Sequence, residues 1–317
     1  MWDIDVTYRT ELSATFERLF EKVKVLEQAR PLPSIALLKI KEALSIEWTY
    51  NSNSIEGNTL SLRETQMVLQ EGITIKGKSL KEHFEAKNHE HAIDYLYTLI
   101  HDGYILNSKD ILSLHGLMLR SIEDDFAGRL RHGGVRISGA NFVPPNANKV
   151  SQLLDDLVDF VVTNRLQLNT IELATFFHHK FVWIHPFFDG NGRMVRLAMN
   201  LILMKQGFPP AIILKNDRKK YYEALNQANK GHYSKLMLLI SQALERTLNI
   251  YISSLPDSGD DYKPISDIVQ EPDIAYGQEY ISLLARQGKI DAHKEGKNWY
   301  TTKEAINNYI ANRKRKR

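Results

Sequence analysis

The sequence predicts a mainly α-helical protein with one small β-hairpin in its middle and a compact helix-and-hairpin unit at its C-terminal end. Apolar residues recur at helical spacing through most of the chain before residue 253. Short β-branched runs with Gly or Asn turns, the pattern of a hairpin, occur in residues 129–143 and 289–300. Residues 253–261 are rich in Ser, Pro, Gly and Asp, which is typical of a linker.

The composition is that of an ordinary globular protein, with 43% hydrophobic and 25% charged residues in 317. A formal charge of +3 is too small to indicate a nucleic-acid or membrane partner for the whole chain. The chain has no cysteine, which excludes disulfides, thiolate nucleophiles and Cys-based metal sites. Because no apolar signal region or bilayer-spanning segment is apparent, we expect a cytoplasmic protein without membrane contact.

The predicted helices begin with an apolar stripe over residues 10–30. Ser34 is the predicted N-cap of a second helix. Gly57 is well placed to stop that helix, and Ser61 with Glu64 predicts a capping box for the next one. Further helices are predicted over residues 80–101, 106–121, 150–164, 171–184, 193–204, 218–229 and 236–252.

Residues 129–143 interrupt this helical pattern. Val135, Ile137 and Phe142 lie in short runs around a Ser-Gly-Ala-Asn turn, and two prolines follow. The pattern fits a β-hairpin and a surface loop about equally well.

Residues 185–193, His-Pro-Phe-Phe-Asp-Gly-Asn-Gly-Arg, form a polar turn between two very apolar segments of helical length. Pro186 cannot donate a backbone hydrogen bond, so the first helix is predicted to end just after His185. Two glycines allow a sharp turn, and Arg193 is predicted to open the next helix. A flexible loop that runs into a helix N-terminus gathers N–H groups and a positive dipole end, which predicts an anion site.

The polar residues of this turn suit phosphate chemistry. His185 has an ordinary pKa near neutrality, as a general base requires. Asp189 offers the hard oxygen ligand that Mg²⁺ prefers. Arg193 and Arg196 lie three residues apart, on one helical face, where both can clamp phosphate oxygens. Together they make up most of the equipment for phosphoryl transfer.

With Arg196 included, the stretch matches every defined position of HPFx[DE]GNGRxxR, and the sequence therefore resembles the Fic family. The resemblance covers roughly residues 34–250. It implies a Fic-type helical bundle and a protein adenylyltransferase, which moves AMP from Mg·ATP to a Ser, Thr or Tyr hydroxyl of a target protein. ATP and Mg²⁺ are the implied cofactors.

The same resemblance implies a role for each residue of the motif. His185 would deprotonate the target hydroxyl, and Asp189 would hold Mg²⁺ on the α and β phosphates. The residues implied to bind the phosphates are Gly190, Asn191, Gly192, Arg193 and Arg196, with Arg196 at the γ-phosphate.

An inhibitory segment is implied at residues 52–58. Ser52-x-x-x-Glu56-Gly57 resembles the inhibitory pattern of Fic proteins, here N-terminal to the core. The resemblance implies that Glu56 pairs with Arg196. A carboxylate on that guanidinium would occupy the place that a γ-phosphate needs.

Two further parts of the site are implied in the same way. Tyr222, Leu225 and Asn229 share one helix face, which by itself fits a face packed on the core. The resemblance implies an adenine pocket there. It also implies that residues 129–143 form a flap that lays a target segment down as an added strand. The flap residues so implied are Val135, Arg136 and Ile137.

The chain is predicted to divide into a helical N-terminal region at 1–105, a catalytic core at 106–252, a linker at 253–261 and a C-terminal module at 262–317. Helix, helix, hairpin and helix in that module resemble a winged helix–turn–helix. The module carries 11 Lys or Arg against 7 Asp or Glu and ends in five consecutive basic residues. DNA is therefore one expected partner, and a peptide or protein target is the other.

Two alternative functions remain open at this point. In the first, Glu56 positions a water molecule that removes AMP from a modified protein. Alternatively, the chain is a DNA-binding regulator whose nucleotide site senses ATP. The sequence does not choose between a monomer and a homodimer.

Overall fold

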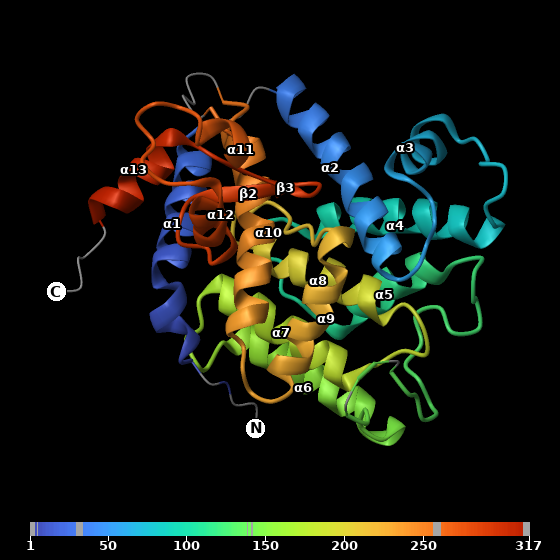
Figure 1. The fold of residues 1–317 in the computed structure, drawn as a ribbon. Coiled ribbons are helices and arrows are strands. Elements are labelled where there is room, and N and C mark those ends of the chain that lie inside the picture. The colour runs from blue at the N-terminus through green and yellow to red at the C-terminus, as the bar shows by residue number, and fades with distance from the viewer. Residues whose placement is uncertain are drawn as a thin grey trace.

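The computed structural model describes residue 4 and residues 6–29, 34–137, 139–140, 142–255 and 261–312. These residues form a mainly helical fold with one small antiparallel sheet, as the sequence predicts (Figure 1). Before the linker, the helices are α1 (Tyr8–Gln28), α2 (Ser34–Ile55), α3 (Leu62–Gln66), α4 (Leu80–Leu99), α5 (Ser108–Leu119), α6 (Val150–Thr163), α7 (Thr170–Ile184), α8 (Asn191–Lys205), α9 (Arg218–Ala228) and α10 (Ser234–Ile252), with short turns η1 (Met67–Glu71), η2 (Ala147–Lys149) and η3 (Lys215–Asp217).

Local sequence signals fix several helix starts. Ser61 and Glu64 form the predicted capping box at α3, in which each side chain bonds the backbone N–H of the other residue. Asn107 caps α5 by accepting a hydrogen bond from the N–H of Asp110 at 3.0 Å. The side chain of Ser34 and the basic tail, two features predicted above, lie outside the described residues.

The core is built around α7 and α8, which pack along one another, while α1 packs along α10 (Figure 1). Phe176, Phe177 and Phe181 of α7 and Met194 and Leu197 of α8 are all fully buried. Burial of each such side chain stabilises the fold by roughly 1.5–3 kcal/mol. This apolar pair carries the polar turn of residues 185–190 at one end, so the turn has a rigid support.

The predicted hairpin at residues 129–143 is wrong, because the described residues of this segment contain no strand. Ser138 and Asn141, at the predicted turn, lie outside the described residues. The segment makes a turn in which the N–H of Ala140 donates to the carbonyl of Ile137 at 3.2 Å. An isolated two-stranded ribbon is marginal in water, and the described chain supplies no third strand beside it.

The C-terminal module contains β1 (Lys263–Pro264), α11 (Ile265–Ile268), α12 (Gln278–Arg286), β2 (Ala292–Glu295), β3 (Asn298–Thr301) and α13 (Lys303–Asn312). The strands form an antiparallel sheet in the order β1-β3-β2, and Glu295 pairs with Asn298 across the turn. The predicted hairpin of residues 289–300 is therefore confirmed. The module also has a hydrophobic cluster of its own, which includes Ile265, Ile268, Ile281, Leu284 and Ile306.

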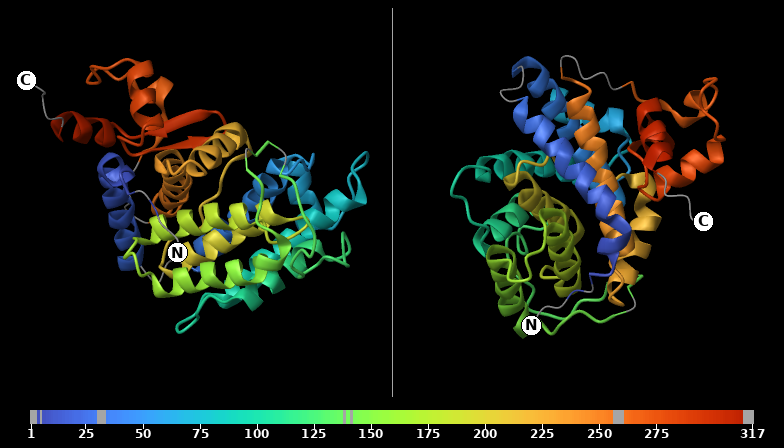
Figure 2. Two further views of the ribbon diagram at one scale, coloured as in Figure 1. Left: turned by 90° about the horizontal axis from the view of Figure 1, so that it is seen from below. Right: turned by 90° about the vertical axis from the view of Figure 1, so that its left-hand side faces the viewer.

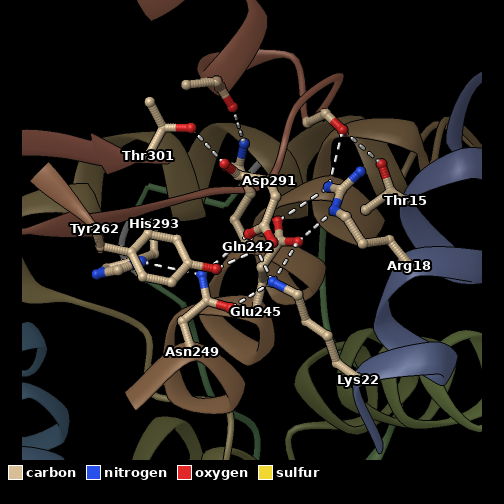
Figure 3. A network of polar contacts seen from close by, with 12 residues as sticks. Thr15, Arg18, Lys22, Gln242, Glu245, Asn249, Tyr262, Asp291, His293 and Thr301 are labelled. Carbon is tan, nitrogen blue, oxygen red and sulfur yellow. Dashed lines mark hydrogen bonds and ion pairs between the residues drawn. The ribbon is translucent and has the colours of Figure 1, made fainter. Parts of the chain in front are cut away.

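A polar network fastens this module to α1 and α10 (Figure 3). Glu245 of α10 accepts from Arg18 at 2.5 Å, and Lys22 donates to Asp291 at 2.6 Å. Asn249 reaches both Asp291 and His293. Because Glu245 is almost completely buried, its partners must be supplied by the docked elements. Figure 2 shows the module on one side of the molecule, against these two helices.

The tip of the module's hairpin is also linked, through one arginine, to α2, the helix that ends just before Glu56. Arg246 of α10 binds Glu47 of α2 at 2.8 Å and Glu295 of the hairpin at 2.8 Å. Lys294 binds Asp217, at the start of α9, at 2.6 Å. One buried guanidinium thus links three parts of the chain. None of the described helices combines the length and apolar character needed to cross a bilayer.

Candidate active site

The site begins where α7 ends, at His185. This residue is the C-cap of the helix and has φ 49° and ψ 64°, a left-handed conformation that is uncommon for a residue other than glycine. Its N–H still donates to the carbonyl of Phe181 at 2.9 Å. The predicted end of the helix at His185 is therefore confirmed. The residue lies where the buried helix passes into the polar turn.

His185 is a neutral imidazole at pH 7. Burial lowers the pKa of its ring to about 4. The backbone carbonyl of Val182 raises this pKa, and the positive charge of Arg131 lowers it. Glu56 and Asp189 raise it by smaller amounts. A general base must be unprotonated to accept a proton, so the ring is in the required form throughout the neutral range.

Side chains of the turn itself hold its backbone. Asn191 accepts from the N–H of Phe187 at 3.0 Å and donates to the carbonyl of the same residue at 2.8 Å. The ring of Phe187 stacks on His115 with centroids 3.6 Å apart. Because the Asn191 amide is used inside the turn, any phosphate contact from this residue must come from its backbone N–H, at the first position of α8.

His115 of α5 also holds the backbone of this turn. Its Nδ1 accepts from the N–H of Gly128 at 3.0 Å, so its Nε2 carries the proton and donates to the carbonyl of Asp189 at 3.0 Å. Gly190 follows with φ 76°, and a β-carbon on it would lie 3.2 Å from that Nε2. Only glycine combines this backbone conformation with such a close approach.

Arg193 is held between two carboxylates. Its Nη1 lies 3.2 Å from Glu85 Oε1 and its Nη2 lies 3.5 Å from Asp189 Oδ2. Asn58 donates to the other oxygen of Glu85 at 2.9 Å. The side chain of Arg193 is 4% exposed whereas that of Asp189 is 49% exposed. The guanidinium is therefore fixed in place, while the Asp189 carboxylate remains accessible.

The segment of residues 52–58, which the family resemblance implies to be inhibitory, contacts the second arginine of the motif. Arg196 Nη2 lies 2.7 Å from Glu56 Oε1 and donates to the carbonyl of Ser52 at 2.8 Å, and its Nε donates to Ser52 Oγ at 3.1 Å. A β-carbon on Gly192 would overlap the Glu56 carboxylate. The carboxylate thus lies directly against the N-terminal turn of α8, where an anion is expected to bind.

The end of α2 is also fastened to the region of α9. Arg218 Nε donates to the carbonyl of Ile55 at 2.7 Å, and Asn51 Oδ1 accepts from the N–H of Lys215 at 2.8 Å. These bonds satisfy a carbonyl and a side chain at the helix C-terminus. They fix the residue that immediately precedes Glu56.

The predicted face of α9 lies beside the motif, but its three residues have different surroundings. Leu225 is 6% exposed and belongs to the main hydrophobic core. Asn229 accepts from His179 Nε2 at 2.8 Å, at a cavity of about 270 Å³. Tyr222 is half-buried, and the guanidinium carbon of Arg218 lies over its ring, 4.9 Å from the ring centroid.

The predicted flap residues, Val135, Arg136 and Ile137, lie in the irregular segment described above. Val135 and Ile137 are half-buried and Arg136 is exposed. Gly133, just before them, faces the ring of Phe188 of the motif, since a β-carbon on it would lie 3.5 Å from that ring. The base of the segment therefore borders the motif.

The donor set around Asp189 fits Mg²⁺ that arrives with a nucleotide. Among the described residues, no three His, Cys, Asp or Glu side chains are arranged to hold a metal ion. Mg²⁺ commonly binds through one or two carboxylates together with phosphates and water. A half-exposed carboxylate at the mouth of an anion site meets that requirement.

Three functional contacts escaped the sequence analysis. Glu85 orients Arg193, His115 holds the Asp189 carbonyl, and Arg131 donates to the carbonyl of His185 at 2.8 Å. Each lies far from the motif in sequence. A lone Glu, His or Arg carries no pattern that distinguishes it from an ordinary helix or loop residue, so no local signal was available.

Fold and site together define a class of helical protein. A histidine, a helix N-terminus with glycine-rich backbone and two buried guanidiniums converge on one polar turn, and the carboxylate of Glu56, just after α2, lies against it. This arrangement is suited to the binding of phosphate groups such as those of a nucleotide.

Comparison with known proteins identifies the family. Residues 105–203 match the Fic/DOC family. The chain is 36% identical over 285 residues to a protein of Aedes aegypti named protein adenylyltransferase Fic, covering 89% of this chain and 55% of that protein. It is 34% identical over 260 residues to protein adenylyltransferase fic-1 of Caenorhabditis elegans, covering 80% of this chain and 50% of the relative. The chain thus spans about half the length of the curated relatives it matches.

A solved structure of Fic-1 from C. elegans superposes with a TM-score of 0.69 at 32% identity, covering 78% of this chain and 72% of that one. A Fic-domain-containing signaling protein from Bacteroides thetaiotaomicron superposes with a TM-score of 0.68 at 26% identity, covering 76% of this chain and 96% of the other. The chain belongs to the Fic/DOC family.

Proposed function

We propose that this protein is an adenylyltransferase that moves AMP from ATP to a Ser, Thr or Tyr hydroxyl of a target protein, and that Glu56 holds it inactive. The names of its relatives and the match to the complete motif support the reaction. The observation that carries the regulation is the 2.7 Å contact between Glu56 and Arg196.

In this reaction the target oxygen bonds to the α-phosphorus while the bond to the bridging oxygen of the β-phosphate breaks, and pyrophosphate leaves. His185 accepts the hydroxyl proton, for which its neutral ring is suited. Backbone N–H groups of Asn191 and Gly192 hold the α-phosphate at the start of α8. The N–H of Gly190 donates to Asp189 Oδ1 at 2.7 Å in this structure and joins them when that bond opens. Mg²⁺ bound at Asp189 would neutralise charge on the α and β phosphates.

The two arginines divide the remaining phosphate charge. Arg193, positioned by Glu85, stabilises charge that develops on the phosphates. Arg196 takes the γ-phosphate once Glu56 has moved away. Because Glu56 and a γ-phosphate need the same guanidinium and the same volume against Gly192, they exclude one another.

Adenine is proposed to lie against the α9 face at Tyr222, Leu225 and Asn229, which offers a half-buried ring, an apolar side chain and an amide, and of these three Asn229 lines the cavity of about 270 Å³. The target segment is proposed to lie along Val135, Arg136 and Ile137. These residues are not paired in a strand in the described chain, so an added strand of a target can bind their backbone groups, apart from the Ile137 carbonyl, which accepts from the N–H of Ala140.

The test is transfer of label from α-³²P-ATP with Mg²⁺ by the wild type, Glu56→Gly and the double variant Glu56→Gly/His185→Ala. We expect label on protein with Glu56→Gly, little with the wild type and none with the double variant. No label from Glu56→Gly on lysate proteins or on itself, in the presence of bound ATP, would reject the transfer reaction.

A second candidate is removal of AMP from a modified protein by water. Glu56 is one-third exposed, and its charge raises the pKa of His185, and these two observations favour a water molecule between the two side chains in the inhibited state. Release of AMP from a pre-modified target by the wild type, lost in Glu56→Gly, would favour this reaction.

We also propose that residues 262–317 form a winged-helix module that recruits a protein target, with residues 253–261 as its linker. The order β1, α11, α12, β2, β3 supports the winged-helix assignment. The hairpin tip is bound to Arg246 and Asp217 of the preceding part of the chain. Exposed residues of both charges, Glu279 and Arg286, line one hollow on α12, which favours protein over DNA. Residues 1–105 and 106–252 share one hydrophobic cluster, so the hydrophobic core is continuous across residue 105. We therefore propose that the division at residue 105 separates a regulatory region from the catalytic core and does not separate two independently folded domains.

A further inference from the structure

Arg131 is a buried cation without a buried anion. Its side chain is 2% exposed, and among the described residues no carboxylate lies within ion-pair distance of it. Burial accordingly lowers the pKa of its guanidinium. Since a buried charge needs compensation, its partners must be found elsewhere.

Backbone carbonyls provide that compensation. The guanidinium donates to His185 O at 2.8 Å through Nε and to Ile184 O at 3.3 Å through Nη2. The N–H of Arg131 donates to Pro186 O at 2.9 Å. Ile184 O and His185 O are carbonyls that α7 leaves unpaired at its C-terminus, where the helix dipole also favours a cation, and Pro186 O follows directly after the helix. Arg131 therefore binds the backbone on both sides of the catalytic candidate.

The same guanidinium closes the base of the flap. Nη1 donates to Gly133 O at 2.9 Å, and Nη2 donates to Pro145 O at 2.5 Å. Gly133 and Pro145 lie at the two ends of the segment that contains the proposed target-positioning residues. The segment has no strand of its own to hold it, so these bonds at its ends fix its position.

We propose that Arg131 is a positioning residue, which fixes His185 and the base of the 133–145 segment relative to each other. It thereby sets the distance between the general base and the hydroxyl that the segment presents. This inference rests on the proposed function for its catalytic consequence, but the joint anchoring is a property of the protein alone. Five donors in a planar fork make Arg the side chain suited to several carbonyls at once.

The test compares Arg131→Gln, Arg131→Lys and the matched control Arg129→Gln, all in the Glu56→Gly background. Arg129 is exposed and two residues away, so its replacement changes net charge without touching the carbonyls. We expect Arg131→Gln to lower transfer at saturating ATP about 100-fold, the effect of a misplacement of about 1 Å, while the dissociation constant for ATP stays within about threefold. Arg131→Lys should recover part of the loss, because an ammonium keeps the charge and three donors.

A purely structural role would lower transfer and ATP binding together, in proportion to the folded fraction measured by circular dichroism, and that result would overturn the inference. So would transfer by Arg131→Gln that equals the parent. If Arg131→Gln does not fold, Arg131→Lys becomes the decisive variant. It must then show reduced transfer at saturating ATP with a nearly unchanged dissociation constant for ATP, although the reduction is smaller.

Amide hydrogen exchange separates this inference from the proposed function. In Arg131→Gln or Arg131→Lys, peptides that cover 133–145 and 182–187 should both exchange faster than in Arg129→Gln, whereas peptides of α8 should not change. If the Glu56→Gly parent transferred no AMP, the proposed function would fail. Hydrogen exchange alone would then test whether Arg131 anchors both segments. Unchanged exchange in either of the two segments would contradict the joint anchoring.

Discussion

Glu56 Oε1 and Arg196 Nη2 lie 2.7 Å apart, although Glu56 lies in the turn after α2 and Arg196 lies in α8, far along the sequence. Arg196 is 3% exposed, so the ion pair is desolvated on the arginine side, while Glu56 remains one-third exposed. Because the Glu56 carboxylate stays in contact with water, the ion pair can be opened from the Glu56 side. A regulator that draws Glu56 outward would expose the guanidinium to a nucleotide.

The first prediction concerns the charge of Glu56. Glu56→Gln keeps the side-chain volume but removes the charge, whereas Glu56→Gly removes both. We expect the affinity for ATP to rise about tenfold or more in Glu56→Gly, the scale of one charge-assisted contact, and by a smaller factor in Glu56→Gln. Calorimetric titration with ATP measures the affinities of the wild type and the two variants. Equal affinity of all three proteins would show that Glu56 does not compete with the γ-phosphate.

The second prediction concerns Arg218, which donates to the carbonyl of Ile55 at 2.7 Å. Arg218→Gln should loosen the end of α2 and raise transfer severalfold, less than Glu56→Gly does, since removal of one hydrogen bond to a charged donor costs roughly 1.5–3 kcal/mol. Lys219→Gln, an exposed neighbour, is the control. Initial rates with labelled ATP provide the measurement, and a decrease in the rate would contradict the proposed hold on Glu56.

The third prediction concerns acid stability. Burial lowers the pKa of His89 and His178 to about 3 and of His115 and His179 to about 4. Because the folded pKa is below the unfolded value of about 6.5, the unfolded state binds more protons, and stability falls as the pH drops from about 6.5 towards 4. Each such histidine contributes up to about 2 kcal/mol to this loss at pH 5.

Urea unfolding at pH 7.5 and pH 5 measures this loss. The midpoint should fall steeply, and His89→Asn, which removes one buried imidazole, should fall less between the two pH values than the wild type does. A midpoint that is constant over this range would mean that these rings are protonated in the folded protein.

The fourth prediction concerns Arg246, which binds Glu47 and Glu295. Arg246→Ala should lower the free energy of unfolding by about 3 kcal/mol, the lower end of the range for breaking a buried ion pair, because Glu295 is partly exposed and can be hydrated. Arg286→Ala, at an exposed position of the module, should change it by less than about 0.5 kcal/mol. Chemical denaturation followed by circular dichroism distinguishes them.

The sequence by itself determined the helices and the motif. Their signals are local: apolar spacing along α7 and α8, the capping box of Ser61 and Glu64, and a proline directly after His185. Such signals act within a few residues of one another, so they can be read from the chain in order. The hairpin at 289–300 was predictable for the same reason, since its turn and strands are contiguous.

Only the tertiary structure decided the surroundings of the site. The carbonyls that Arg131 binds, the carbonyl that His115 holds and the carboxylate that orients Arg193 are brought there by packing of separate elements. The hairpin predicted at 129–143 was wrong for the same reason, because its formation depends on separate elements of the fold. Its β-branched residues suit a strand, but a strand needs a partner for its backbone, and the rest of the described chain provides none.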